Sequence, residues 1–214
     1  PRCISCNFLH LCAGYYRYDQ GHMPAFQGLA DYRGMLVHAQ QWPQDLDYAG
    51  KRVVVIGSGA TAVTLVPHLA QTAAHVTMLQ RSPTFVAALP SVDSFALRMR
   101  ALFSPARAYA IVRRKNIYAN QALFSLSMRW PQLVRRLLLG TVRRILGEGA
   151  YTQKHFNPTY EPWRQRLCVA PDGDLFHAIA AGRASVVTQA IANFTAGGIK
   201  LESGQELQAD VVVM

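Results

Sequence analysis

Residues 53–81 have the sequence VVVIGSGATAVTLVPHLAQTAAHVTMLQR, which decides the fold. The apolar run Val53–Ile56 predicts a buried strand, and a glycine-rich turn follows it. An apolar helix and a second strand, Val76–Gln80, come next. This order is typical of a βαβ unit that binds a dinucleotide. The alternative is a glycine-rich turn with a packing role only.

Each position of the turn has its own physical role. Gly57 allows the tight turn out of the strand, and Gly59 lets a pyrophosphate approach the backbone. Ala62 still permits close packing of the helix on the strand. The pyrophosphate would lie on the N–H groups that open the helix from about Ala60. The predicted cofactor-binding residues of the turn are Gly57, Ser58, Gly59, Ala60, Thr61 and Ala62.

The end of the second strand favours one dinucleotide over the other. NAD-binding units carry an acid there for the ribose 2′-hydroxyl, but this sequence has Gln80-Arg81-Ser82. A guanidinium pairs well with a phosphate, so Arg81 with Ser82 favours NADP. The alternative is that Arg81 is an ordinary solvated surface residue.

Composition indicates a globular protein. The 214 residues are 50% hydrophobic and 16% charged, which suits one good core, or one domain with part of another. No apolar run approaches the roughly 20 residues of a membrane span, and we recognise no secretory signal. The four cysteines form no disulfide framework, which favours a cytoplasmic protein. Cys3 and Cys6 have redox or metal spacing, but no second cysteine pair or histidine cluster accompanies them. We therefore predict ordinary thiols and no metal site.

The net charge of +10 is concentrated in one segment. Residues 94–147 contain eleven Arg or Lys and no Asp or Glu, with apolar residues at helical spacing. We expect amphipathic helices here. Three interpretations stay open: a solvated basic face, association with an anionic membrane surface, and attraction of an anionic cofactor. Nucleic acid is not expected, because no binding motif accompanies the charge.

The expected fold class is α/β with four regions along the chain. Residues 1–30 would be a strand, Phe8–Gly14, and a loop, while 31–50 would be a linker. Residues 51–180 would be a Rossmann-type domain with the basic helical insertion 94–147 and an irregular stretch at 151–166. Residues 181–214 would return toward a second domain. There the apolar Val211–Met214 would enter the sheet that also holds Phe8–Cys12.

The linker carries a specific resemblance. Residues 32–43, YRGMLVHAQQWP, closely resemble the Baeyer–Villiger monooxygenase fingerprint FxGxxxHxxxW followed by Pro or Asp. Tyr32 replaces Phe, while Gly34, His38 and Trp42 stand at the expected spacing. The related N- and S-oxidising flavin monooxygenases usually carry Tyr or Phe where Trp42 stands. Taken alone, His38 and Trp42 would more often be structural residues. The resemblance to the Baeyer–Villiger and flavin-containing monooxygenases extends over essentially the whole chain.

The resemblance implies a two-dinucleotide enzyme, NADPH-dependent and of class EC 1.14.13.-, with FAD on one Rossmann domain and NADP on the other. It implies that NADPH reduces the flavin, that O₂ adds to the flavin, and that the peroxide formed oxidises a ketone or a sulfur compound such as a thioamide. The four fingerprint residues would couple the domains. The FAD-binding glycine turn of the family lies before the residues present here. We therefore expect an internal fragment that binds NADP(H) and does not oxygenate alone.

The resemblance also assigns a role to Arg166. This residue falls where the family carries the arginine of a Lys-Arg-Leu pattern, which would stabilise the negative flavin and hold the nicotinamide. Alone, it would more often be a surface ion pair. Gln165 replaces the lysine that helps to bind the 2′-phosphate in relatives, which places more of the NADP preference on Arg81. The alternatives are an N- or S-oxidising flavin monooxygenase and a non-catalytic NADP-binding module.

Overall fold

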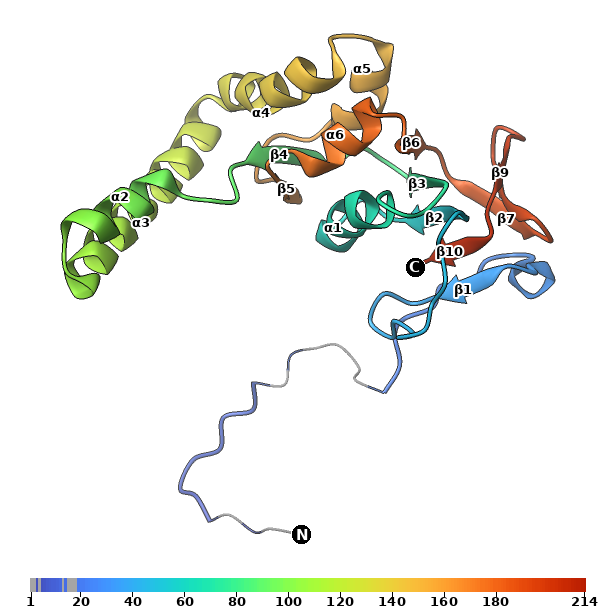
Figure 1. Ribbon diagram of the computed structural model, residues 1–214, viewed down its shortest axis with the longest axis horizontal. Coiled ribbons are helices and arrows are strands. Elements are labelled where there is room, and N and C mark those ends of the chain that lie inside the picture. The colour runs from blue at the N-terminus through green and yellow to red at the C-terminus, as the bar shows by residue number, and fades with distance from the viewer. Residues whose placement is uncertain (1–2, 4, 13, 15–18) are drawn as a thin grey trace.

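The protein is described from a computed structural model that covers all residues except 1–2, 4, 13 and 15–18. Its centre is a five-stranded sheet in which all neighbouring strands are parallel (Figure 1). The order across this main sheet is β1 (Met35–Val37), β10 (Val211–Val213), β2 (Arg52–Ile56), β3 (His75–Gln80) and β6 (Ala184–Thr188).

The main sheet is covered on both faces, which explains why its central strands β10 and β2 are largely apolar. Val53 and Val55 contribute to a core shared with α1 (Ala60–Leu69) and α6 (Asp174–Ala180). The side chain between them, Val54, enters a second core on the other face. That face is covered by an antiparallel sheet made of β7 (Ile191–Thr195), β8 (Gly198–Leu201) and β9 (Glu206–Gln208).

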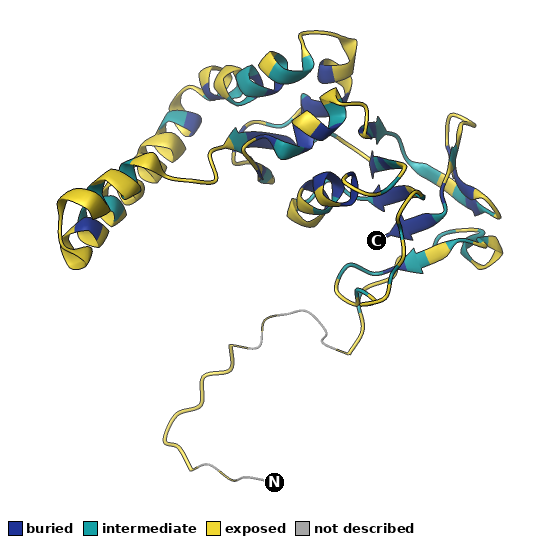
Figure 2. Ribbon diagram, viewed as in Figure 1, coloured by how far each residue is buried: buried dark blue, intermediate teal, exposed yellow. Residues whose placement is uncertain are grey.

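A long insertion lies between two further strands, β4 (Phe85–Leu89) and β5 (Leu167–Pro171), which pair in parallel. Its helices are α2 (Ser94–Leu102), α3 (Pro105–Arg129), α4 (Pro131–Leu146) and α5 (Ala150–Phe156). In Figure 1, α2 and α3 form an arm that extends from the α/β body, and α4 joins this arm to the body, where it lies against β4 and α6. Figure 2 shows that the outer part of the arm is mostly exposed. We call α2 to α4 the helical arm.

Several sequence-based expectations are confirmed. The strand–turn–helix–strand unit is present, with its second strand extended by one residue to His75. Residues 94–147 are helical, with Pro105 and Pro131 at the first positions of α3 and α4, where proline is well tolerated. Turns at residues 196–197 and 202–204 separate β7, β8 and β9.

Three expectations about local structure are wrong. Phe8–Cys12 form no strand: Phe8 is 82% exposed, and no strand lies beside these residues to pair with their backbone. Ala13, inside the predicted Phe8–Gly14 strand, lies outside the described residues. The stretch 151–166 is not irregular throughout, because residues 150–156 form α5, with His155 and Phe156 buried. Strand β10 does not join Phe8–Cys12; it lies between β1 and β2.

The main sheet also crosses the expected regional boundaries. Strand β1 comes from the predicted linker 31–50, and β6 and β10 come from the predicted return segment 181–214. These three strands form one sheet with β2 and β3 and do not belong to a separate sheet. The assignment of residues 1–30 and 181–214 to a second dinucleotide-binding domain stays a prediction.

Among the described residues, no helix combines the length and the apolar character needed to cross a bilayer. The described part also contains no group of three His, Cys, Asp or Glu side chains placed to hold a metal ion.

An ion pair ties the start of β2 to the start of β10. The Arg52 side chain donates to Asp210 through Nη2 at 2.7 Å and Nε at 3.1 Å, and the Arg52 backbone N–H also donates to this carboxylate at 2.8 Å. These hydrogen bonds lower the pKa of Asp210 to about 2. A carboxyl whose pKa is lowered by folding stabilises the folded state above its ordinary pKa, and this contribution disappears as the pH falls toward 2.

We expect Asp210→Asn to lower the free energy of unfolding at pH 7 by up to about 1 kcal/mol, since both partners are partly exposed and solvent weakens the pair. The difference from wild type should shrink below about pH 4, as the wild-type carboxyl is protonated. Urea unfolding of both proteins at several pH values measures this difference in unfolding free energy. Asp47→Asn is the control, because Asp47 pairs with Lys51 at 3.6 Å and is 73% exposed. A difference in unfolding free energy between Asp210→Asn and wild type that stays the same at every pH would contradict a stabilising role for the ionised Asp210 carboxylate.

Candidate functional site

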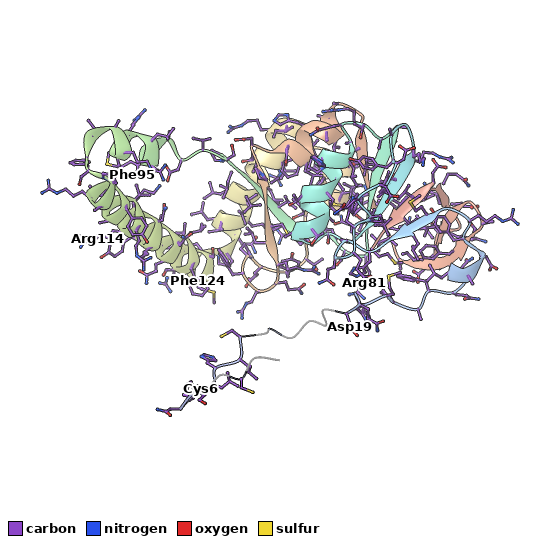
Figure 3. All side chains as sticks on the ribbon, turned by 60° about the horizontal axis from the view of Figure 1, so that its bottom comes forward. Cys6, Asp19, Arg81, Phe95, Arg114 and Phe124 are labelled. Carbon is purple, nitrogen blue, oxygen red and sulfur yellow. The ribbon has the colours of Figure 1, made fainter. Side chains whose placement is uncertain are left out.

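A cavity of about 400 Å³ lies at the carboxyl edge of the main sheet, where β2, β3 and β6 end. Ligands of open α/β sheets bind outside this edge. The cavity combines apolar walls with polar and cationic groups, and its lining residues are Phe26, Ile56, Gly57, Ser58, Leu79, Gln80, Arg81, Ser82, Arg166, Gln189, Ala190 and Ile191. Figure 3 labels Arg81 on the α/β body, well away from Arg114 and Phe124 of the helical arm.

The two glycines of the turn are needed for different reasons. Gly57 has φ 129°, a conformation that favours glycine, although a Cβ there would have open space. A Cβ on Gly59 would lie 3.0 Å from Nη1 of Arg166, so this position keeps space free beside a guanidinium. Helix α1 starts directly after Gly59 with no side-chain cap and no acid in its first turn. Its first N–H groups therefore suit an anion.

The other residues of the turn divide between the cavity and the core. Ser58 lines the cavity, and its hydroxyl shares a 2.8 Å hydrogen bond with that of Thr84. Ala62 is 4% exposed and packs in the core, as its expected role in helix–strand packing requires. Ala60 and Thr61 are exposed at the start of α1 and are not among the residues that line the cavity.

The strand end before Arg81 is held by a buried polar network. The Gln80 side-chain amide donates to the backbone oxygen of His155 at 2.8 Å and to the hydroxyl of Thr188 at 2.9 Å. Nδ1 of His155 lies 2.7 Å from the same hydroxyl. Burial lowers the pKa of His155 to about 4, so the ring is neutral at pH 7. Arg81 thus begins from a fixed backbone position at the mouth of the cavity.

Arg166 reaches the same cavity from a different part of the chain. Its backbone oxygen accepts a 2.8 Å hydrogen bond from the hydroxyl of Tyr160. Arg135 of α4 holds this loop by donating to the oxygens of Tyr160, Asn157 and Pro158. Two positions far apart in the sequence, Arg81 and Arg166, therefore line one cavity. Both are exposed, and an anionic ligand could reach either guanidinium.

Cys168 lies close behind the glycine-rich turn. Its thiol donates to the backbone oxygen of Ser58 at 3.7 Å, and burial raises its pKa. The thiol is therefore an inert packing group rather than a nucleophile. Cys3, Cys6 and Cys12 are exposed and free of disulfides.

The four fingerprint residues do not line the cavity; they attach the chain before β1 and the chain after it to the rest of the body. The Tyr32 hydroxyl donates to the backbone oxygen of Ala209 at 3.0 Å, and burial raises its pKa to about 12. A Cβ on Gly34 would lie 2.2 Å from that hydroxyl, so glycine is required there. Trp42 packs on the helix-side core, and Nδ1 of His38 accepts a 3.2 Å hydrogen bond from the Gln40 backbone.

Four cavity residues outside the predicted strands escape sequence reasoning. Phe26 comes from a stretch expected to be a loop, and Gln189, Ala190 and Ile191 run from the end of β6 to the first residue of β7. The only available signal is that Gln189 follows the strand Ala184–Thr188. The end of a parallel strand is where ligand-contacting residues stand.

The residues present suit a dinucleotide phosphate. A turn with two glycines, an uncapped helix start and two guanidinium groups leave room and supply donors for a pyrophosphate and a further phosphate. The fold is that of a dinucleotide-binding α/β domain with a helical insertion.

The chain belongs to the flavin-binding monooxygenase-like family, whose model matches residues 6–129. It is 50% identical over 211 residues to the FAD-containing monooxygenase EthA of Mycobacterium tuberculosis strain H37Rv, and 52% identical over 211 residues to EthA of Mycolicibacterium smegmatis. In both comparisons 98% of this chain aligns with 43% of the relative, so the chain spans less than half the length of these proteins.

Two solved structures share the fold. A steroid monooxygenase bound to NADP matches with a TM-score of 0.67 at 20% identity, over 90% of this chain and 44% of that one. The complex of OTEMO with FAD and NADP matches with a TM-score of 0.69 at 19% identity, over 90% and 44%. In both comparisons the matched part is less than half of the solved protein.

We expect Tyr32→Phe to lower the free energy of unfolding by about 1 kcal/mol, because the buried Ala209 loses the donor to its carbonyl. NADPH affinity should change less than about twofold, since Tyr32 does not line the cavity. Urea unfolding and an NADPH titration measure the two effects. Tyr118→Phe is the control, because Tyr118 is 68% exposed on the helical arm. A large loss of affinity with unchanged stability would place Tyr32 in the site instead.

Proposed function

We propose that this chain is the NADP(H)-binding part of a flavin-dependent monooxygenase. The observation that carries the proposal is that the glycine-rich turn, Arg81 and Arg166 border one cavity at the carboxyl edge of a parallel sheet. Family membership supports it, because the similar proteins EthA are FAD-containing monooxygenases. The whole protein would transfer one oxygen atom from O₂ to a ketone or to a sulfur compound.

The residues present would have separate tasks. The N–H groups at the start of α1 would hold the pyrophosphate, and Arg81 with Ser82 would hold the 2′-phosphate. The Arg166 guanidinium, which lies beside Gly59, would neutralise the negative charge of the pyrophosphate. It would also keep a positive charge near the nicotinamide and flavin rings. When bound, the nicotinamide supplies a hydride and the flavin activates O₂ for transfer to the substrate. We assign the flavin site to the protein outside these residues, so they alone would not oxygenate.

Trp42 favours a Baeyer–Villiger-type enzyme over the N- and S-oxidising flavin monooxygenases, which usually carry Tyr or Phe at this fingerprint position. The fingerprint itself does not choose between a ketone and a sulfur compound as the substrate. A non-catalytic NADP-binding module is the alternative to an enzyme. The enzyme and the non-catalytic module would use the same cavity, and each would need the preference for NADP that Arg81 would confer.

We expect the two cavity arginines to give different patterns of lost affinity. Arg81→Ala should weaken NADPH binding roughly tenfold to hundredfold and leave NADH binding unchanged, because only NADPH carries the 2′-phosphate. Arg166→Ala should weaken both cofactors by a similar factor, because the pyrophosphate is common to both. Calorimetric titration of each variant with NADPH and NADH measures these losses.

The control for these titrations is Arg183→Ala, an exposed arginine on the body that does not line this cavity. Unchanged NADPH affinity in Arg81→Ala would remove the basis for the NADP assignment. Equal losses for NADPH and NADH in Arg81→Ala would place this residue at the pyrophosphate instead.

A second proposed role concerns the helical arm, which would bind an anionic membrane surface. Eleven cations lie in residues 94–147 with no acid among them. Three are already engaged: Lys115 with Asp93, Arg143 with Glu148 and Arg135 with the loop before Arg166. The other eight have no salt-bridge partner among the described residues. Large exposed apolar side chains accompany them, including Leu102, Tyr109, Tyr118 and Phe124. Cationic and apolar groups together suit an anionic lipid surface.

We expect the chain to float with phosphatidylglycerol-containing vesicles and not with pure phosphatidylcholine vesicles. Replacing Arg113 and Arg114 with Gln should weaken binding roughly thirtyfold, since each cation near the surface contributes about 1 kcal/mol. High salt should release the chain. Arg183→Gln with Lys200→Gln is the matched control on the body. Equal flotation with both vesicle types, or an equal loss in the control, would rule out an electrostatic surface on the arm.

A further inference from the structure

One polar atom in the cavity has no partner. The side-chain oxygen Oε1 of Gln189 is buried, and no hydrogen-bond donor lies within reach among the described residues. Gln189 itself lines the cavity. A buried acceptor without a donor is unfavourable, and such a group in a native structure calls for an explanation. A donor supplied by the ligand would satisfy it once the side chain turns toward the cavity.

The position of Gln189 is fixed relative to Arg81. Strands β3 and β6 are parallel neighbours in which Gln80 pairs with Thr188, so Arg81 and Gln189 are the next residues of the two strands. The backbone N–H of Gln189 also donates to the oxygen of Gln80 at 2.9 Å. Gln189 therefore lies at the same end of the cavity as the residue assigned to the 2′-phosphate.

The chemistry of the ligand then selects the group that Gln189 meets. In NADP the 2′-phosphate and the adenine ring are carried by the same ribose, while the nicotinamide lies beyond the pyrophosphate. The adenosine end carries two kinds of donor, the ribose 3′-hydroxyl and the adenine 6-amino group, and only the amino group is attached to a flat ring. The walls beside Gln189 suit such a ring, since Phe26, Leu79 and Ile191 are apolar.

We propose that Gln189 selects adenine by accepting a hydrogen bond from its 6-amino group. This inference rests on the proposed NADP(H) site and extends it to the base. A glutamine amide matches the adenine edge, because its oxygen accepts from N6 while its nitrogen donates to N7. Hypoxanthine carries an oxygen in place of the amino group, so its edge presents two acceptors, and the amide satisfies only one of them.

The test compares NADPH with its hypoxanthine analogue, nicotinamide hypoxanthine dinucleotide phosphate, by titration. Wild type should bind NADPH about tenfold more tightly than the analogue. Gln189→Leu should bring the two affinities within about twofold of each other. Gln189→Glu keeps an acceptor at this position and should preserve the preference for adenine. Arg81→Ala should weaken both ligands equally and leave the ratio unchanged.

Two readouts separate a role in binding from a role in folding. Gln189→Leu should melt no lower than wild type, because an apolar side chain of similar size removes an unsatisfied acceptor. If wild type binds NADPH in an Arg81-dependent way but shows no preference over the analogue, or if Gln189→Leu keeps that preference, this inference is overturned and the NADP assignment stands. If wild type binds neither ligand, the proposed function itself fails.

Discussion

The parallel pairing of β10 between β1 and β2 is the constraint on which the rest of the structure depends. Val211, Val212 and Val213 are each at most 1% exposed and contribute to the cores on both faces of the main sheet. Without β10, the strand before the glycine-rich turn would lose a neighbour, and β1 would have no strand to pair with. The Arg52–Asp210 pair and the Tyr32 hydrogen bond to Ala209 both act at the entrance to this strand. The fingerprint and the glycine-rich turn are therefore linked through β10 rather than by direct contact.

The cavity follows from the same sheet. Parallel strands all present their carboxyl ends on one edge, so Gly57, Arg81 and Gln189 are brought together although they are far apart in the sequence. Each follows directly after a strand of the main sheet, where sheet pairing of the preceding residues fixes the position of the backbone. Arg166 differs, because it lies on a loop and needs Tyr160 and Arg135 to hold that loop in place.

The sequence predicted the parts of the fold that are governed by local patterns. The apolar runs at Val53–Ile56 and Val76–Gln80 and the amphipathic spacing in 94–147 each have a period that identifies the element. Sequence patterns failed where pairing between distant segments determines the structure. The segment 31–50 was expected to be a linker and gave no sign of strand β1 at Met35–Val37. The apolar run Val211–Val213 predicted burial but not which strands lie beside it. The stretch 151–166 is rich in prolines and aromatics and was expected to be irregular. Its first part instead belongs to helix α5, in which Phe156 is buried. Arg81 was identified from its position after a strand; Gln189 has the same position, but its significance depends on an unsatisfied atom that only the structure reveals.

The helical arm and the cavity are connected by a short series of contacts. Arg135 of α4 donates to the loop 157–160, the hydroxyl of Tyr160 donates to the backbone oxygen of Arg166, and Phe124 of α3 packs edge-to-face on Trp163 at 6.2 Å between ring centroids. Trp163 adopts φ 66°, which is rare outside glycine, so the surrounding contacts must hold the loop in this conformation. A switch would need a second arrangement of these contacts, and coupling energy comes only from a difference between two states. These contacts run from the arm to the loop that carries Arg166, so the arm supports the conformation of this loop and the position of one guanidinium.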